Sequence, residues 1–282
     1  MDAATPLAPL DAALEGLRQG RAEESLSALV FQLATRRGAS SAESWNAFVA
    51  EARAHPLREA IHRDPFAFRS YSKPRGYTPD ATCLDYVLRA RDMPVRTRDP
   101  VSAIHHFVTH GQMARALVFR RDAVAREIDK ASAFRDNRIG SVVAFDMDPE
   151  NLDGLRREYP GLPIVAHHGT LRQIAEGRHL FGDMDLVYSA GMLETLPHAS
   201  AVGLARALYA MLAPGGTMLL THFLPGLDDA GFLEVFFDWR MVYRSPPDLF
   251  DLVKELPTET VSTWVYSESK EGTIGVVSIQ RR

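Results

Sequence analysis

The stretch from Ser141 to Glu150 constrains the fold more than any other part of this chain. Its residues, Ser-Val-Val-Ala-Phe-Asp-Met-Asp-Pro-Glu, form a short apolar run that stops at a carboxylate and then opens a helix. Asp148 suits the N-cap position and Pro149 the first helical position. A strand that ends in an acid is typical of a nucleotide-type cofactor site, because the acid accepts both ribose hydroxyls. The alternative is a buried strand and a capped helix without a ligand.

The residues that follow alternate between strand and helix patterns. Residues 185–191 predict a second buried strand that runs into a small-residue turn. Residues 199–212 predict a helix with one apolar face, which stops at the Ala-Pro-Gly-Gly of 213–216. A third strand is expected over 217–223. This rhythm predicts parallel pairing, and therefore an α/β sheet.

The end of the chain follows a different pattern. Residues 261–266 and 273–279 are both strand-like, and the segment 267–272 between them contains a Lys-Glu-Gly turn. Two strands joined by so short a turn pair antiparallel. The sequence therefore predicts a terminal antiparallel hairpin.

Helices dominate the beginning of the chain. The apolar positions between Leu10 and Thr35 predict two helices separated near Gly20, and Ser41 is expected to cap the next one. Residues 63–80 contain three prolines and a glycine together with four aromatic residues, so they are expected to be irregular and to pack on another element.

These patterns divide the chain into two expected regions. A helical N-terminal region over residues 1–100 includes an irregular Lys-Pro-Arg-Gly-Tyr segment, and an α/β domain covers 101–282. Asp80 is expected to cap a helix over 81–91, and Ala114 to Ala133 reads as one further helix. Pro94 and Pro100 mark the expected boundary.

Composition excludes several classes of protein. The 282 residues are 46% hydrophobic, which is ample for a core, and the net charge of −4 provides no basic surface for nucleic acid. No apolar run approaches the ~18 residues of a membrane span, and no basic-then-apolar signal pattern opens the chain. The single cysteine, Cys83, fits a reducing compartment, so a cytoplasmic location is expected.

A parallel sheet closed by an antiparallel hairpin, with an early acid and a late Leu-Ala-Pro-Gly-Gly, resembles the class I S-adenosylmethionine-dependent methyltransferases. Ser72-Lys-Pro-Arg-Gly-Tyr77, followed by Asp80, looks like the KPRGYAGD signature of one bacterial group of these enzymes. That group includes proteins of extracellular fatty-acid (hydroxypalmitate) methyl ester biosynthesis. Residues 185–191 and 237–244 are also similar to it, and the resemblance covers roughly 64–282.

The resemblance implies a Rossmann-like methyltransferase sheet, S-adenosylmethionine as cofactor and a small-molecule substrate of acyl or hydroxy-acid type. The cofactor-binding candidates lie at the ends of the expected strands: Asp146, Asp148, Gly169, Thr170, Ser189 and Gly191. For Gly169 and Thr170 the alternative is a strand end with a helix cap. The catalytic candidates are His222, Tyr77 and Arg240, with His222 as a possible base after the late strand.

One departure from the family pattern matters most. Class I methyltransferases carry a glycine-rich loop after their first strand, and its bare backbone lets the methionine end of the cofactor approach. No such loop lies before Asp146, and the missing strand would be the central one. The only nearby substitute, 116–119, is followed by Arg120 rather than by glycines. We therefore predict that this chain binds S-adenosylmethionine weakly or not at all.

Three functions remain open at this stage. The first is a methyltransferase-like protein acting on a small molecule, and the second is a degenerate, non-catalytic binding or scaffold protein that keeps the fold. The third is a cofactor-independent enzyme with the same fold, for which the sequence contains no distinctive residues. No nucleic-acid partner, membrane span or metal site is expected. His105, His106 and His110 are the residues that would bind a metal ion if such a site were present. A homodimer through the N-terminal helices is a further expectation.

Overall fold

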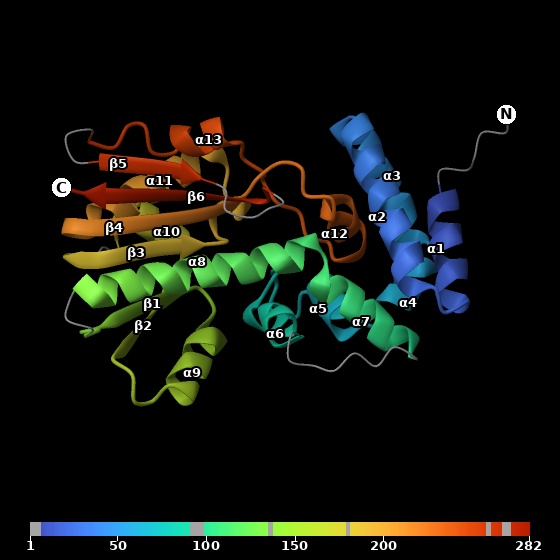
Figure 1. Ribbon diagram of the computed structural model, residues 1–282, viewed down its shortest axis with the longest axis horizontal. Coiled ribbons are helices and arrows are strands. Elements are labelled where there is room, and N and C mark those ends of the chain that lie inside the picture. Colours follow the sequence, from blue (N-terminus) through green and yellow to red (C-terminus); the bar gives the residue numbers. More distant parts are fainter. Residues whose placement is uncertain (1–6, 91–98, 135–137, 179–180, 258–260, 267–271) are drawn as a thin grey trace. The chain divides into compact units, whose positions relative to one another are not determined.

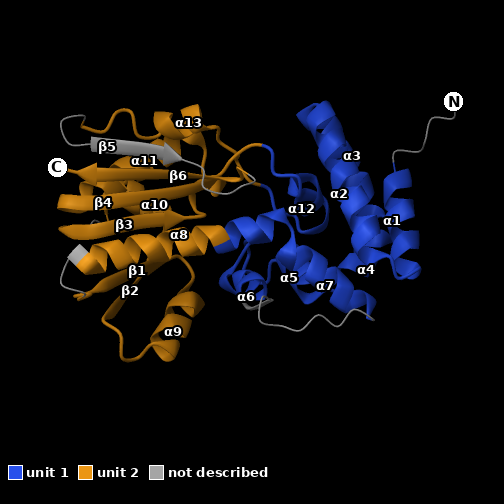
Figure 2. Cartoon of the chain, viewed as in Figure 1, with its two compact units in different colours: residues 1–118, 226–240 blue, residues 119–225, 241–282 orange. Residues whose placement is uncertain are grey.

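The computed structural model describes residues 7–90, 99–134, 138–178, 181–257, 261–266 and 272–282. The chain forms two compact units (Figures 1 and 2), which are considered separately. Unit 1 comprises Met1–Val118 and Gly226–Arg240, and unit 2 comprises Phe119–Pro225 and Met241–Arg282. The expected boundary near residue 100 therefore lies inside unit 1, which also takes in a later segment of the chain.

Unit 1 is helical, as the sequence predicted for the beginning of the chain. Its helices are α1 (Ala8–Arg18), α2 (Ala22–Ala39), α3 (Ala42–Ala54), α4 (Leu57–Ile61), α5 (Pro65–Ser72), α6 (Ala81–Ala90), α7 (Pro100–His110) and α12 (Ala230–Phe236), with the first turns of α8 (Gln112–Phe134). The break near Gly20, which has φ +74°, is confirmed. Ser41 caps α3 as predicted, because its hydroxyl accepts from the backbone N–H of Ser44 at 3.2 Å.

The expectation of an irregular stretch over residues 63–80 is wrong in its first half. Pro65–Ser72 is helix α5, because the buried carboxylate of Asp64 accepts from the N–H of Ala67 and Pro65 occupies the first turn. The Asp-Pro pair thus begins a helix instead of breaking one. Asp80 caps α6 as expected, by accepting from the N–H of Cys83 at 2.9 Å.

Unit 2 contains two separate sheets within the described residues. Strands β1 (Val142–Asp146) and β2 (Ile164–His168) pair in parallel, with helix α9 (Pro149–Glu158) between them in sequence. The larger sheet has the order β3-β4-β6-β5, and β3 (Met184–Ala190) pairs in parallel with β4 (Leu212–Phe223). Its connection carries the short 3₁₀ turn Leu193–Thr195 and helix α11 (His198–Ala210). The predicted parallel pairing of strands that alternate with helices is confirmed, whereas the single sheet that was expected is divided into two among the described residues.

The last strands, β5 (Val261–Tyr266) and β6 (Ile274–Arg281), pair antiparallel, as predicted. Residues 267–271 of the expected turn lie outside the described residues. The Ala-Pro-Gly-Gly stretch was expected to separate a helix from the strand that follows, but it lies within β4 and forms a bulge there: the register shifts between Met184 and Leu186. Gly216 is required there, since an added Cβ would lie 2.5 Å from the carbonyl oxygen of Met184.

The strand expected at the centre of a methyltransferase sheet has no counterpart in the described residues. Residues 116–119 belong to α8, so they do not form a substitute strand. β1 and β3 do not pair with each other, and Figure 1 shows the unit 2 part of α8 running between them in that view. Ala123 and Val124 of this helix are buried. Among the described residues, β1 therefore pairs only with β2, and β3 only with β4.

The core of unit 2 lies between the larger sheet and the helices α10 (Leu171–Ala175), α11 and α13 (Pro246–Asp251). Phe145 of β1 packs against the same cluster.

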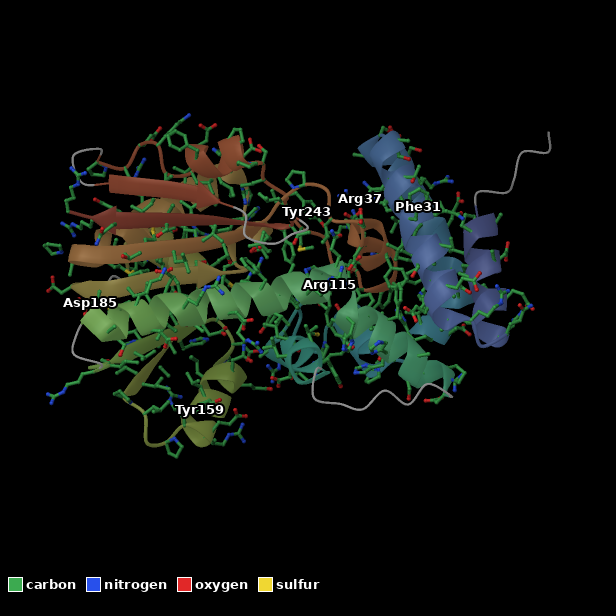
Figure 3. All side chains as sticks on the ribbon, in the orientation of Figure 1. Phe31, Arg37, Arg115, Tyr159, Asp185 and Tyr243 are labelled. Carbon is green, nitrogen blue, oxygen red and sulfur yellow. The ribbon has the colours of Figure 1, made fainter. Side chains whose placement is uncertain are left out.

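Single large apolar side chains remain exposed, including Phe31 on α2 and Tyr159 after α9 (Figure 3). None of the helices in the described part of the chain combines the length and the apolar character that crossing a bilayer requires.

Candidate functional site

The first part of the candidate site is the acid at the end of β1. Asp146 is partly exposed, and one carboxylate oxygen accepts from the N–H of Asp148 at 2.8 Å while the other accepts from the amide of Asn151 at 3.0 Å. Asp148 is 7% exposed and caps α9 by accepting from the N–H of Glu150 at 2.9 Å. Of the two predicted acids, Asp146 is therefore the one that a ligand can reach.

The turn after β2 lies beside this acid. The N–H of Gly169 donates to the carbonyl oxygen of Asp146 at 3.0 Å, which joins the two strand ends. A Cβ on Gly169 would lie 2.5 Å from the ring of Phe145, so glycine allows this close approach. Thr170 caps α10 in a capping box with Gln173. The strand end and helix cap that were the alternative to a ligand site are thus both present. Contacts of Gly169 and Thr170 with a ligand stay a prediction.

The turn after β3 faces an arginine, Arg120, that is not among the predicted site residues. Ser189 is buried on β3, and Gly191 follows this strand with φ +97°. The guanidinium of Arg120, from α8, lies over the bare Cα of Gly191: an added Cβ would be 2.6 Å from Arg120 Nη1. Arg120 thus fills the space that the missing side chain of Gly191 leaves open.

Arg120 belongs to a buried polar cluster at the carboxyl ends of β3 and β4. Its guanidinium donates to Glu194 Oε1 and lies 4.6 Å from the centroid of the Phe223 ring. Glu194 Oε1 also accepts from the N–H of Phe223 at 3.2 Å. Arg120 and Glu194 are 6% and 3% exposed, so this is a buried ion pair. The sequence feature that could have indicated this ion pair is Arg120 itself, an arginine at a place where the family resemblance requires glycine.

His222 is buried at the end of β4 and is neutral at physiological pH. Burial lowers its pKa to about 4; Glu194 acts in the opposite direction, whereas Arg244 and Arg120 also lower the pKa. Its Nε2 donates to the carbonyl oxygen of Val242 at 2.8 Å, so the lone pair is on Nδ1. A histidine with so low a pKa is a weak general base, which disfavours the predicted catalytic role.

Arg244 holds the backbone of the segment that follows β3. Its guanidinium donates to the carbonyl oxygens of Leu193 at 2.8 Å and Leu196 at 2.6 Å. Burial lowers the pKa of Arg244, while Glu194 raises it, and the side chain stays cationic. We conclude that Arg244 positions the turn carrying Glu194 and is not aimed at a substrate carboxylate.

Two predicted catalytic residues belong to unit 1. Arg240 is exposed and donates to the side chain of Asn46 at 2.8 Å, and Tyr77 is partly buried in the segment before α6. That segment is anchored within unit 1, because Lys73 Nζ lies 2.5 Å from Asp238 Oδ2. Trp239 is buried but is not part of a helix, so Trp239 and Tyr243 do not share a helix face. The catalytic roles of Tyr77 and Arg240 stay predictions.

The histidines weighed as metal ligands are engaged in other contacts. His105 Nδ1 lies 2.5 Å from the buried carboxylate of Asp64, and the rings of His106 and His110 stack with centroids 4.1 Å apart. Across the described ranges, no group of three or more His, Cys, Asp or Glu side chains is arranged to hold a metal ion.

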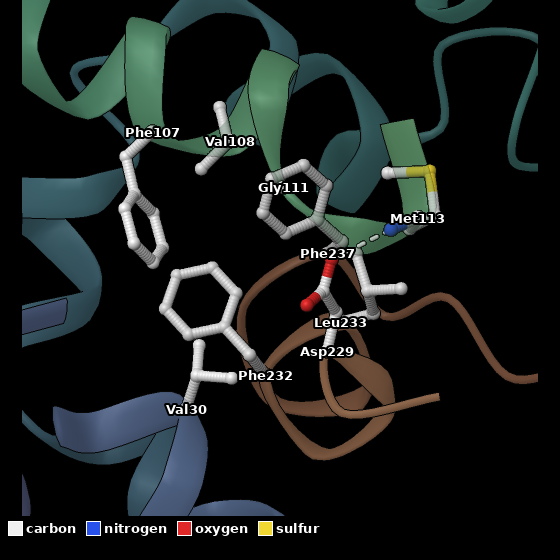
Figure 4. Close-up of a pocket in the computed structure, with 9 residues that line it drawn as sticks. All are labelled: Val30, Phe107, Val108, Gly111, Met113, Asp229, Phe232, Leu233 and Phe237. Carbon is white, nitrogen blue, oxygen red and sulfur yellow. Dashed lines mark hydrogen bonds between the residues drawn. The ribbon is translucent and has the colours of Figure 1, made fainter. Parts of the chain in front are cut away.

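Unit 1 encloses a small cavity (Figure 4). Its walls are apolar apart from Asp229, whose carboxylate accepts from the N–H of Met113 at 2.8 Å. The residues that line it are Val30, Phe107, Val108, Gly111, Met113, Asp229, Phe232, Leu233 and Phe237. The volume of about 20 Å³ suffices for roughly one water molecule, so the cavity is not a substrate pocket.

Comparisons with known proteins identify a shared fold. No protein-family model matches the chain. No curated protein matches it either. Among solved structures, a protein of Bordetella parapertussis described as a possible exported protein aligns over 100% of this chain and 99% of its own, with 13% identity and a TM-score of 0.52. This similarity shows that the two proteins share a fold and shows nothing about function.

Two further similar structures are named as methyltransferases. Magnesium protoporphyrin IX methyltransferase of Synechocystis PCC 6803, with bound SAH, covers 61% of this chain and 88% of its own at 11% identity and TM-score 0.45. A TehB-like SAM-dependent methyltransferase of Corynebacterium glutamicum covers 50% and 68% at 14% identity and TM-score 0.36. Both scores are too low to support an inference about this chain.

Proposed function

We propose that this chain is a S-adenosylmethionine-dependent methyltransferase-like protein that acts on a small molecule. The strand pairing supports the proposal: β1 pairs with β2 and β3 with β4 in parallel, and β6 runs antiparallel beside β4, which is the pattern that the resemblance implies on the two sides of a missing central strand. That missing strand is the central strand that the sequence resemblance requires. An acyl or hydroxy-acid substrate follows from the resemblance of residues 72–77 alone.

This chain offers a candidate partner for the ribose of a nucleoside-type cofactor but none for its methionine portion. At the β1 end, the partly exposed carboxylate of Asp146 keeps lone pairs for ribose hydroxyls beside the bonds it already accepts. At the β3 end, Arg120 stands over Gly191, and no glycine-rich loop makes room for the methionine portion. The ribose thus has a candidate partner and the methionine portion has none, so we derive no methyl-transfer step.

This misfit supports a second candidate, a non-catalytic protein that binds the nucleoside portion of a ligand. In a complete cofactor site, the amino-acid portion adds affinity beyond that of adenosine. In this chain the methionine portion has no prepared site, so S-adenosylhomocysteine and adenosine should bind with similar, weak affinity. The same experiment therefore separates the two candidates.

Calorimetry with adenosine and S-adenosylhomocysteine tests the proposal on the full chain. We expect weak binding of both ligands, and we expect Asp146→Ala to reduce it by about 1.5–3 kcal/mol for each charge-assisted bond lost. The control is Asp153→Ala, since Asp153 is exposed on α9, the helix that follows β1, and pairs only locally with Arg156 in the contacts described. Loss of binding in Asp148→Ala alone would identify the other acid as the ribose ligand. Much tighter binding of S-adenosylhomocysteine than of adenosine would restore the full methyltransferase function.

A further inference from the structure

We propose that Glu194, Phe223 and Gly191 form a binding site for a small organic cation, a sulfonium or an ammonium, which the guanidinium of Arg120 occupies in this structure. The inference rests on the proposed function only where S-adenosylmethionine is named as a ligand, because the site is defined by residues of unit 2 alone. No residue of unit 1 belongs to the site.

Each wall of this site has the chemistry that a cation needs. Glu194 supplies a buried carboxylate, which is stable in the interior only beside a positive charge. The ring of Phe223 presents its face at 4.6 Å to the guanidinium carbon, the geometry of a cation–π contact. Gly191, at φ +97°, leaves its backbone bare on the third side.

The unpaired atoms around Arg120 indicate the polarity of the missing ligand. Within the part of the chain that the structure describes, Glu194 Oε2 and His222 Nδ1 are buried and have no hydrogen-bond partner. Both are acceptors, since Nε2 of His222 is the nitrogen that carries the hydrogen. A ligand that brings positive charge and N–H or polarised C–H groups beside Glu194 would satisfy its Oε2, whereas an anion would be repelled by Glu194.

Arg120 occupies the site but leaves some of the buried polar atoms there without a hydrogen-bond partner. Its own Nε has no hydrogen-bond partner among the described residues, although the side chain is buried. Arg120 thus neutralises Glu194 but fits the site imperfectly. A ligand that displaces it must replace the positive charge, and this condition selects cations over neutral molecules of the same shape.

The test removes the resident cation and offers a free one. The full chain carrying Arg120→Ala is titrated with trimethylsulfonium, and tert-butanol serves as a neutral molecule of similar shape. We expect Arg120→Ala to bind trimethylsulfonium, and the double variant Arg120→Ala/Glu194→Gln to bind it roughly tenfold or more weakly. Arg121→Ala is the matched control, because Arg121 is exposed and pairs with the adjacent Asp122. It should bind no better than wild type.

Thermal unfolding covers the case in which Arg120→Ala is too unstable for calorimetry. A cation that enters the site raises the melting temperature of the variant, and tert-butanol does not. Arg120→Met keeps the aliphatic stem and should show the same selectivity with a smaller shift. Equal responses to trimethylsulfonium and tert-butanol, or a response that persists in Arg120→Ala/Glu194→Gln, would overturn the proposal and leave Arg120 and Glu194 as a structural ion pair.

S-adenosylmethionine and S-adenosylhomocysteine separate this inference from the proposed function. Only the first carries a sulfonium, so Arg120→Ala should gain affinity for S-adenosylmethionine roughly tenfold over its gain for S-adenosylhomocysteine. If trimethylsulfonium binds to Arg120→Ala but neither nucleoside ligand does, the cation site stands and the proposed function fails. If both nucleoside ligands bind through Asp146 but no cation preference appears, the proposed function stands and the cation site fails.

Discussion

The neutral, buried His222 makes the stability of this protein depend on pH in a calculable way. Its pKa is about 4 in the folded chain, against an ordinary value of 6.5, chiefly because burial disfavours the protonated ring. Between these two pH values the unfolded chain binds a proton that the folded chain does not. The contribution of His222 to the free energy of unfolding should therefore fall as the pH falls from 6.5 to 4, by about 3 kcal/mol in total, and stay constant below pH 4.

The comparison variant is His222→Gln, whose amide can still donate to the carbonyl oxygen of Val242 but does not titrate. Urea unfolding of wild type and variant at several pH values between 7.5 and 4 isolates this contribution, because the carboxylates common to both proteins cancel. We expect wild type to lose about 3 kcal/mol relative to the variant over that window. A difference that stays constant with pH would refute the assignment of a buried, neutral His222.

Two further predictions concern the turns that carry the candidate site. Asp148→Ala removes the N-cap of α9, where the carboxylate accepts from the N–H of Glu150, and should lower the free energy of unfolding by ~1 kcal/mol in urea titrations. Gly169→Ala places a Cβ 2.5 Å from the ring of Phe145 and should cost about 1–3 kcal/mol. Gly154→Ala is its control: nothing lies within 4 Å of the added Cβ, so inside α9 it should stabilise by up to ~1 kcal/mol, and a loss of stability there would contradict the reasoning.

Local signals predicted most of the elements, because they act over a few residues and depend little on the rest of the chain. Ser41, Asp80 and Asp148 were each expected to cap a helix, and each accepts from a backbone N–H near the start of that helix. The antiparallel pairing of β5 and β6 was likewise expected from two strand-like runs and a short turn. The parallel β1–β2 and β3–β4 pairs followed from the alternation of strands and helices.

Signals with two meanings were resolved only by packing. Asp64-Pro65 was interpreted as part of an irregular segment, yet it begins α5, where the buried Asp64 also contacts His105 from α7. The Ala-Pro-Gly-Gly stretch was interpreted as the end of a helix before a strand, yet it forms a bulge within β4, where the carbonyl oxygen of Met184 lies against Gly216. Both motifs are locally compatible with either outcome, so contacts distant in sequence decided them.

The sequence by itself determined the α/β class of unit 2, the acid at the end of β1 and the absence of a glycine-rich loop before it. Only the tertiary structure decided what stands at the carboxyl ends of β3 and β4. Arg120 and Glu194 are 74 residues apart, and nothing local in either segment predicts that they meet. Burial then gives this pair its meaning, because a carboxylate in the interior requires a cation, and the fold brings Arg120 there across Gly191.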